Sequence, residues 1–185
     1  MRKQTTDRIR RRSFIVQVGR LAAGAVAMAL YGRLPATTWT RELPFRHTHT
    51  GESLSLLCTS GGAFDTVGLD RVDHFLRDFR TGEVHQIDPG LLEFLRDLHR
   101  ETGSHGVFEV ISGFRSPATN RMLRGKSRDV AKKSLHMQGR AIDVRLTDVS
   151  TDDLRDAAVH LKRGGVGYYR NSDFVHLDTG RFRTW

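Results

Sequence analysis

The sequence GGVGYYRNSDFVHLD, residues 164–178, contains two short apolar runs separated by a polar turn. Residues 166–169 and 174–178 have the length of strands, and the turn at residues 170–172 is short enough to join them as an antiparallel hairpin. His176 places an imidazole among the apolar residues of the second run. The segment therefore predicts a C-terminal β-hairpin that carries a candidate functional side chain.

A second strand is predicted just upstream of this hairpin, in the run SLHMQGRAIDVRL at residues 134–146. Residues 140–146 alternate between apolar and polar or small side chains, which is typical of a half-buried strand. Ile142 and Val144 would face the core, and Asp143 would project from the opposite face. His136 precedes this strand by a few residues and follows Ser134, while Gly139 is expected to shape the turn between them.

The rest of the chain mixes helices with strands. Helices are indicated by apolar spacing and by capping residues such as Asp88, Ser116 and Ser150. The predicted elements are a hairpin at 43–58, a helix at 69–80, a helix after Asp88-Pro89, a strand at 107–111, a short helix from Ser116-Pro117 to about Leu123, and a helix after Ser150 that ends at Gly164-Gly165. This order predicts an α+β fold with a central antiparallel sheet and flanking helices.

Charge is distributed unevenly along the 185 residues, which suffice for one domain with a tail. The formal net charge is +9, but residues 1–36 alone carry eight Lys or Arg and one acid. The remaining residues carry 22 basic and 20 acidic side chains. A domain so close to neutrality has no electrostatic basis for binding nucleic acid, so that class of function is excluded.

Residues 1–36 are typical of an export signal, which leaves residues 37–185 as the globular domain. The uninterrupted apolar run at 21–31 is too short for a membrane-spanning helix, so no permanent transmembrane span is expected. Arg11-Arg12 followed by Ser13-Phe14-Ile15 resembles a twin-arginine motif, which implies the twin-arginine translocation machinery as a partner and the periplasm as destination. An uncleaved signal would retain the protein at the inner membrane. The alternative is a basic amphipathic helix that lies on a membrane surface.

Two of the nine histidines stand close to strand residues that could act with them. His136, Asp143 and His176 together provide two imidazoles and a carboxylate, the ligand set of a catalytic zinc with an open position for water. The single cysteine excludes a Cys-rich zinc site. The alternative is a core histidine beside an exposed strand aspartate. The other seven histidines are expected at the surface: His47, His49, His74, His85, His99, His105 and His160.

Several motifs occur in the order found in one group of peptidases. SLHMQGRAID and FVHLD resemble the metal motifs of the D-Ala-D-Ala carboxypeptidase and hedgehog-type zinc metallopeptidases, and SGFRSPATN at 112–120 resembles the arginine motif of that group. With HTGES, RDFRTGEVHQIDPGLL and the terminal RFRTW, residues 45–185 are most similar to the YcbK-like murein endopeptidases. The resemblance implies a hedgehog/D-Ala-D-Ala-peptidase-like fold.

The resemblance also implies roles for individual residues. His136, Asp143 and His176 would be the zinc ligands, and Arg115 would bind substrate or stabilise the oxyanion. Two carboxylates are open as the general base. Asp173 stands three residues before the last histidine. Asp178 shares a strand face with His176, so it could instead orient that ring.

The function implied is that of a periplasmic zinc-dependent endopeptidase, which hydrolyses the peptide cross-links of murein, including those made through diaminopimelate. The alternative is a non-catalytic, zinc-containing module that binds the cell wall on the same fold.

Overall fold

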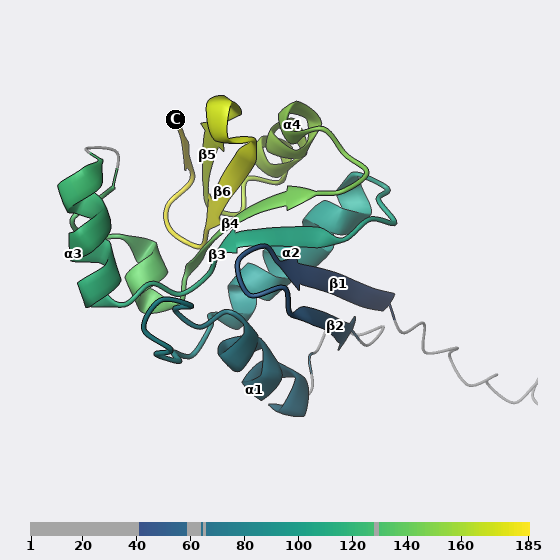
Figure 1. Cartoon of the computed structure of the whole chain (residues 1–185). Coiled ribbons are helices and arrows are strands. Elements are labelled where there is room, and N and C mark those ends of the chain that lie inside the picture. Colours follow the sequence, from purple (N-terminus) through teal and green to yellow (C-terminus); the bar gives the residue numbers. More distant parts are fainter. Residues whose placement is uncertain (1–40, 59–63, 65, 128–129) are drawn as a thin grey trace, which may run out of the picture. The chain divides into compact units, whose positions relative to one another are not determined.

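The computed structural model describes residues 41–58, 64, 66–127 and 130–185 of the chain (Figure 1). Every described residue belongs to one compact unit, which begins at Thr38 and ends at Trp185. The predicted export signal at residues 1–36 lies outside the described residues, so it stays a prediction. Within the described part, no helix has both the length and the apolar character needed to cross a membrane.

Helices and strands alternate irregularly along the described residues, which confirms the α+β class. The strands form one seven-stranded sheet in the order β2-β1-β3-β4-β6-β5-β7. They are β1 (Arg41–His47), β2 (Ser53–Cys58), β3 (Phe108–Ser112), β4 (Ala141–Leu146), β5 (Gly165–Tyr169), β6 (Phe174–Asp178) and β7 (Arg183–Thr184). The helices are α1 (Thr66–Phe75), α2 (Pro89–Glu101), α3 (Pro117–Lys126) and α4 (Thr151–Leu161), with 3-10 turns η1 (Leu135–Gln138) and η2 (Arg170–Ser172).

The sheet is mixed, whereas the sequence predicted an antiparallel one. The hairpins β1–β2 and β5–β6 are antiparallel, as are the pairs β3–β4 and β4–β6. The pairs β1–β3 and β5–β7 are parallel. A long connection containing α1 and α2 separates β1 from β3 in the sequence, and such a crossover allows two neighbouring strands to run in the same direction. These parallel pairings correct the fold prediction.

Local capping explains where the helices begin. The side chains of Asp88, Ser116 and Ser150 accept hydrogen bonds from backbone N–H groups in the first turns of α2, α3 and α4. The prediction of a helix at 69–80 was wrong at its end, because α1 stops at Phe75. The Asp78 carboxylate accepts from the backbone N–H groups of Arg80 and Ser116, at 3.0 and 2.9 Å. These bonds hold the chain in a turn instead of a further helical turn.

One face of the sheet builds the core. α4 packs against β4, β5 and β6, and α2 packs against α4 (Figure 1). Alternate residues of the strands point to these helices, so Ile142 and Leu177 are fully buried with Leu154 of α4 in one apolar cluster. Asp143 and His176 are the sequence neighbours of Ile142 and Leu177, and they project from the opposite face of the sheet. The sheet thus presents a polar site on one face and rests on packed apolar side chains on the other.

Candidate metal centre

His136 is presented by the short turn η1. The Ser134 hydroxyl accepts a hydrogen bond from the His136 backbone N–H at 3.3 Å, which caps the start of the turn. Gly139 ends the turn with a φ of 64°, and a Cβ at this position would collide with the carbonyl of Gln86. Glycine is therefore required by both conformation and space, and the turn holds His136 just before the start of β4.

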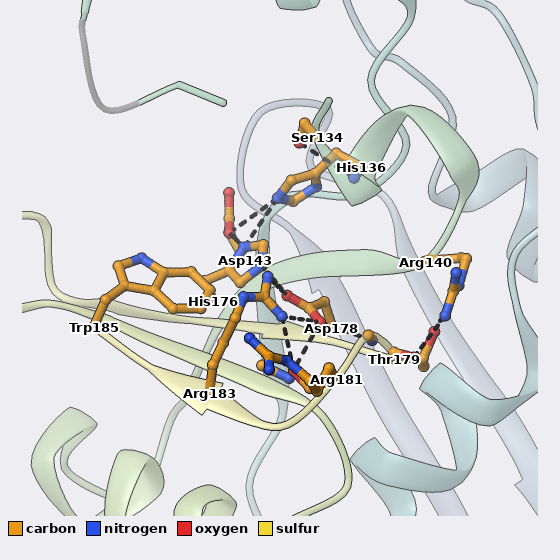
Figure 2. A network of polar contacts seen from close by, with 12 residues as sticks. Ser134, His136, Arg140, Asp143, His176, Asp178, Thr179, Arg181, Arg183 and Trp185 are labelled. Carbon is orange, nitrogen blue, oxygen red and sulfur yellow. Dashed lines mark hydrogen bonds and ion pairs between the residues drawn. The ribbon is translucent and has the colours of Figure 1, made fainter. Parts of the chain in front are cut away.

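Asp143 and His176 face one another across the β4–β6 ladder, where they are directly paired in the antiparallel register. Asp143 Oδ1 lies 2.9 Å from His176 Nδ1 and 3.2 Å from His136 Nε2. The two ring nitrogens are 3.2 Å apart. Figure 2 shows the three side chains converging from η1, β4 and β6. The structure thus brings together the three residues predicted as ligands, within the reach of a single cation.

The outer nitrogens of both imidazoles have acceptors as partners. His136 Nδ1 lies 2.8 Å from the backbone carbonyl oxygen of Gly113, and His176 Nε2 lies 3.1 Å from Asp178 Oδ2. A carbonyl and a carboxylate only accept, so these partners assign the proton of each neutral ring to its outer nitrogen. The inner nitrogens then present lone pairs to each other and to Asp143. Three converging lone pairs without a proton between them fit a bound metal cation.

The pKa values of the three side chains are shifted by burial and by their contacts with one another. Burial alone would raise the pKa of Asp143, but the two imidazoles hold it well below its usual range. Burial lowers the pKa of His136. Burial also opposes the charged form of His176, yet the hydrogen bonds to Asp143 and Asp178 raise its pKa to about 9. Positive charge at the centre of this cluster is therefore favoured, whereas Asp143 stays ionised.

Asp178 lies behind His176, on the side of the ring away from Asp143. It is fully buried. Its Oδ2 accepts from Arg183 Nη2 at 2.7 Å, and its Oδ1 accepts from the N–H groups of Gly165 and Gly180 at 3.1 and 2.8 Å. Burial would raise the pKa of Asp178, but His176 and Arg183 keep it far below its ordinary value. These contacts are those of a residue that orients the His176 ring.

Asp173, the other predicted base, is not among the residues that line the cleft beside the cluster. Its exposed carboxylate accepts from the Thr151 hydroxyl at 2.9 Å and pairs with Arg145 at 3.4 Å. Of the described acids, Asp143 and Asp178 are the ones that line this cleft. The identity of the general base therefore stays a prediction.

Arg115 points into the site from the segment that follows an irregularity in β3. The β3–β4 register shifts between Val110 and Ser112, so that Ser112 pairs with Asp143. Such a bulge re-aims the side chains that follow it. Arg115 Nη2 then lies 3.3 Å from Ser112 Oγ and 3.5 Å from Asp143 Oδ2. Burial lowers the pKa of this guanidinium, and Asp143 opposes that shift. Its buried Nε has no hydrogen-bond partner among the described residues.

A cleft of about 490 Å³ opens over the cluster. Arg183 and Trp185 line this cleft, and sequence reasoning missed both. Their only signal was the terminal RFRTW motif in the family resemblance. The described residues that line the cleft are Arg115, Ser127, Val130, Ala131, Lys133, Ser134, Leu135, His136, Asp143, Tyr169, Ser172, Phe174, His176, Asp178, Arg183 and Trp185.

Two buried imidazoles and a carboxylate at the base of a cleft define the candidate metal centre of a metallopeptidase. Residues 35–185 match the family model described as Peptidoglycan L,D-endopeptidase MepK, and the chain belongs to this family. This membership confirms the resemblance to YcbK-like murein endopeptidases.

Curated relatives agree with this assignment. The Peptidoglycan L,D-endopeptidase MepK of Escherichia coli (strain K12) is 40% identical over 171 residues, which cover 89% of this chain and 94% of that protein. The Probable peptidoglycan L,D-endopeptidase MepK of Haemophilus influenzae is 42% identical over 151 residues, or 81% of each chain. No solved structure matches the chain significantly.

Proposed function

We propose that this protein is a zinc-dependent peptidoglycan endopeptidase that hydrolyses peptide cross-links in murein. The observation that carries the proposal is the convergence of His136 Nε2, His176 Nδ1 and an Asp143 oxygen at the base of an open cleft. Two nitrogens and one oxygen from three segments suit a catalytic zinc, which leaves a fourth position open. Membership of the endopeptidase family supplies the class of substrate.

The roles of the side chains follow from their contacts. When bound, zinc acts as a Lewis acid toward the scissile carbonyl and lowers the pKa of water to about 7. His136, Asp143 and His176 would hold the ion, and Asp178 fixes the tautomer and direction of His176 through its hydrogen bond to Nε2. Arg115 supplies a fixed positive charge against the oxyanion that develops as the peptide bond is attacked.

The general base is proposed to be one of two carboxylates. Asp178 touches His176 but is already occupied by Arg183 and two backbone N–H groups. Asp173 is exposed and lies outside the cleft lining, so it would have to approach from the loop before β6. The present contacts favour an orienting role for Asp178.

Three further parts of the proposal are the bond that is cleaved, the fold family and the cellular location of the protein. The names of both relatives include the term L,D-endopeptidase. This supports cross-links made through diaminopimelate as the substrate. A hedgehog/D-Ala-D-Ala-peptidase-like fold fits the mixed sheet with His and Asp ligands on one face. The basic, Arg11-Arg12-containing segment at 1–36 supports export by the twin-arginine machinery to the periplasm.

The decisive experiment uses purified full-length protein and muropeptide dimers with either an L,D or a D,D cross-link. Zinc-loaded protein should release monomers from the L,D dimer, as followed by liquid chromatography and mass spectrometry, and chelation should abolish the release. His136→Ala serves as the control, with folding checked by circular dichroism. Binding of the dimers without any cleavage by zinc-replete protein would overturn the enzymatic proposal in favour of the wall-binding module.

A further inference from the structure

Trp185 forms an aromatic wall of the cleft beside the metal cluster. Its indole ring lies 5.2 Å from the His176 ring, centroid to centroid, and is half exposed to the cleft. Figure 2 shows the indole beside His176, with the Arg183 side chain reaching toward Asp178. Neither the metal ligands nor the oxyanion need this side chain. An exposed aromatic face next to a reaction centre is therefore a feature that the proposed chemistry does not use.

The position of the indole is fixed by several contacts. Trp185 Nε1 donates to the Tyr169 hydroxyl at 3.1 Å, and Tyr169 in turn stacks on Phe174 with centroids 4.6 Å apart. The Trp185 backbone pairs with one edge of β5 before and after Gly167, since Tyr168 N–H donates to its carbonyl at 3.0 Å and its own N–H donates to the Val166 carbonyl at 3.3 Å. The ring is thus held in place before any ligand arrives.

Gly167 provides the seat for this ring. A Cβ at position 167 would lie 2.6–2.7 Å from three atoms of the indole, closer than any real contact. Gly167 pairs with His176 across the β5–β6 ladder, so the missing side chain leaves space on the same face as the metal cluster. Only glycine lets the indole lie against the sheet at this point.

The strand order places the indole and Arg115 on opposite sides of the cluster. Ser112 of β3, Asp143 of β4, His176 of β6 and Gly167 of β5 form one row across the sheet. Arg115 contacts Ser112 at one end of this row, and Trp185 covers Gly167 at the other. A peptide held at the metal centre would therefore have a guanidinium on one side and an indole face on the other.

We propose that Trp185 is a substrate-contacting residue whose indole face packs against the peptide stem next to the scissile bond, and that Gly167 is the residue that seats it. Planar amides and aliphatic side chains of a peptide both pack well on an indole face, whereas the charged end groups of the stem would turn to the cations of the cleft. The inference rests on the proposed function for the identity of the substrate, a murein peptide.

The first test separates substrate binding from turnover. Trp185→Ala should raise the KM for the L,D-linked dimer by about 10-fold while kcat changes by less than about 3-fold, because a contact made equally in ground and transition states affects KM. Trp185→Phe should restore most of the affinity. The matched control is Phe182→Ala, which removes an exposed aromatic from the same segment but outside the cleft lining. An unchanged KM in Trp185→Ala, or an equal rise in Phe182→Ala, would overturn the proposal.

A second variant tests the seat without removing the indole. Gly167→Ala should displace the ring and raise KM as Trp185→Ala does, with zinc content unchanged. In the Gly167→Ala/Trp185→Ala double variant the glycine substitution should add nothing further, because the ring with which it collides is gone. Additive effects, or loss of zinc in Gly167→Ala, would mean that Gly167 serves the metal cluster and not the indole.

A spectroscopic readout makes the inference independent of catalysis. The sequence has two tryptophans, Trp39 and Trp185, so Trp39→Phe leaves Trp185 as the sole indole reporter. The muropeptide dimer should shift or quench its fluorescence saturably in His136→Ala protein, which should cleave the dimer too slowly to consume it during the titration. A response without any cleavage by zinc-loaded protein would support the indole contact and refute the proposed enzyme. Normal cleavage without a response would refute the contact alone.

Discussion

The two faces of strands β4 and β6 differ in what their residues do, although the residues are neighbours in the sequence. Ile142 and Leu177 lie on the helix-covered face and are fully buried among apolar side chains. Asp143 and His176, one position away, lie on the other face and contact each other at 2.9 Å. Strand alternation alone assigns one residue to packing and the next to chemistry.

This difference teaches that stability and activity are separable on these strands. Removing apolar volume should affect the free energy of unfolding and leave the site intact. Removing His136 should affect metal binding and turnover with little change in stability, because Asp143 keeps His176 as its partner and no buried charge is left unpaired. The predictions below test this separation.

The largest effect is expected for His136→Ala. Loss of one of three ligands should reduce zinc affinity and lower the cleavage rate by about 10³-fold or more, since a bound metal stabilises the transition state by several kcal/mol. The chemical denaturation midpoint of the metal-free protein should move little. Zinc content by mass spectrometry, cleavage of the L,D dimer and a denaturation curve measure the three quantities. Full activity at normal zinc content would exclude His136 as a ligand.

Arg115→Ala should slow turnover by about 10²–10³-fold, because the guanidinium beside Asp143 is positioned against developing negative charge. Arg115→Lys should recover only part of this loss, since an ammonium lacks the planar fork. Steady-state kinetics with zinc content and thermal unfolding measured in parallel make the comparison. A folded, zinc-replete Arg115→Ala protein with near-normal turnover would remove Arg115 from the mechanism.

His47 is the polar exception on the apolar face, and it should make the fold acid-sensitive. It is fully buried against Phe75, and burial and then His49 lower its pKa from 6.5 to about 4. The unfolded chain therefore binds more protons between these values. Stability should be complete above about pH 6.5 and fall by roughly 3 kcal/mol as the pH approaches 4.

Urea denaturation at several pH values measures this loss. His47→Asn, which keeps an acceptor for the His49 N–H, should flatten the dependence between pH 6.5 and 4. His160→Gln is the matched control, because its side chain is 77% exposed. The prediction is wrong if wild type and His47→Asn lose the same stability over this range.

Asp178→Asn should weaken zinc binding by about 10–100-fold, which is the usual cost of removing the partner that orients a metal-binding histidine. Asp173→Asn should leave zinc affinity unchanged, because Asp173 touches none of the three ligands. A competition titration with a chromophoric chelator measures both affinities. The same pair of variants addresses the general base: if Asp173→Asn abolishes turnover at full zinc content, the base is Asp173 and the loop before β6 must move.

The smallest effect is expected on the apolar face. Ile142→Val removes one methylene next to Asp143 in the sequence and should cost about 0.5–1.5 kcal/mol of unfolding free energy. Turnover per folded molecule and zinc content should match the wild type. Denaturation and kinetics on the same preparation test this. A drop in zinc affinity would show that the two faces of β4 are coupled.

Sequence reasoning predicted the elements whose signals are local. The caps at Asp88 and Ser150 and the alternation around Asp143 depend on residues within a few positions of each other, so they could be found without the fold. The grouping of His136 with Asp143 and His176 also followed from spacing and from the family motifs, and the structure places these residues together.

The features that sequence reasoning missed depend on distant contacts. The parallel pairing of β1 with β3 requires a crossover whose direction no local pattern specifies. His47 and His99 were expected at the surface, but they are buried against Phe75 and Phe108 from other elements. Trp185 reaches His176 only because β7 returns to the edge of β5. Each of these contacts is set by topology and not by neighbouring residues.

The bulge in β3 leaves one residue, Ile111, without a partner in the β3–β4 ladder. Val110 faces the core, and Ser112 is turned to the site because one extra residue, Ile111, is inserted between their paired positions. Deleting Ile111 would restore a regular ladder and leave Ser112 opposite Asp143, because Val110 already pairs with Val144, the neighbour of Asp143. The strand can therefore lose one residue at this point while the polar side chain that faces the site stays in register.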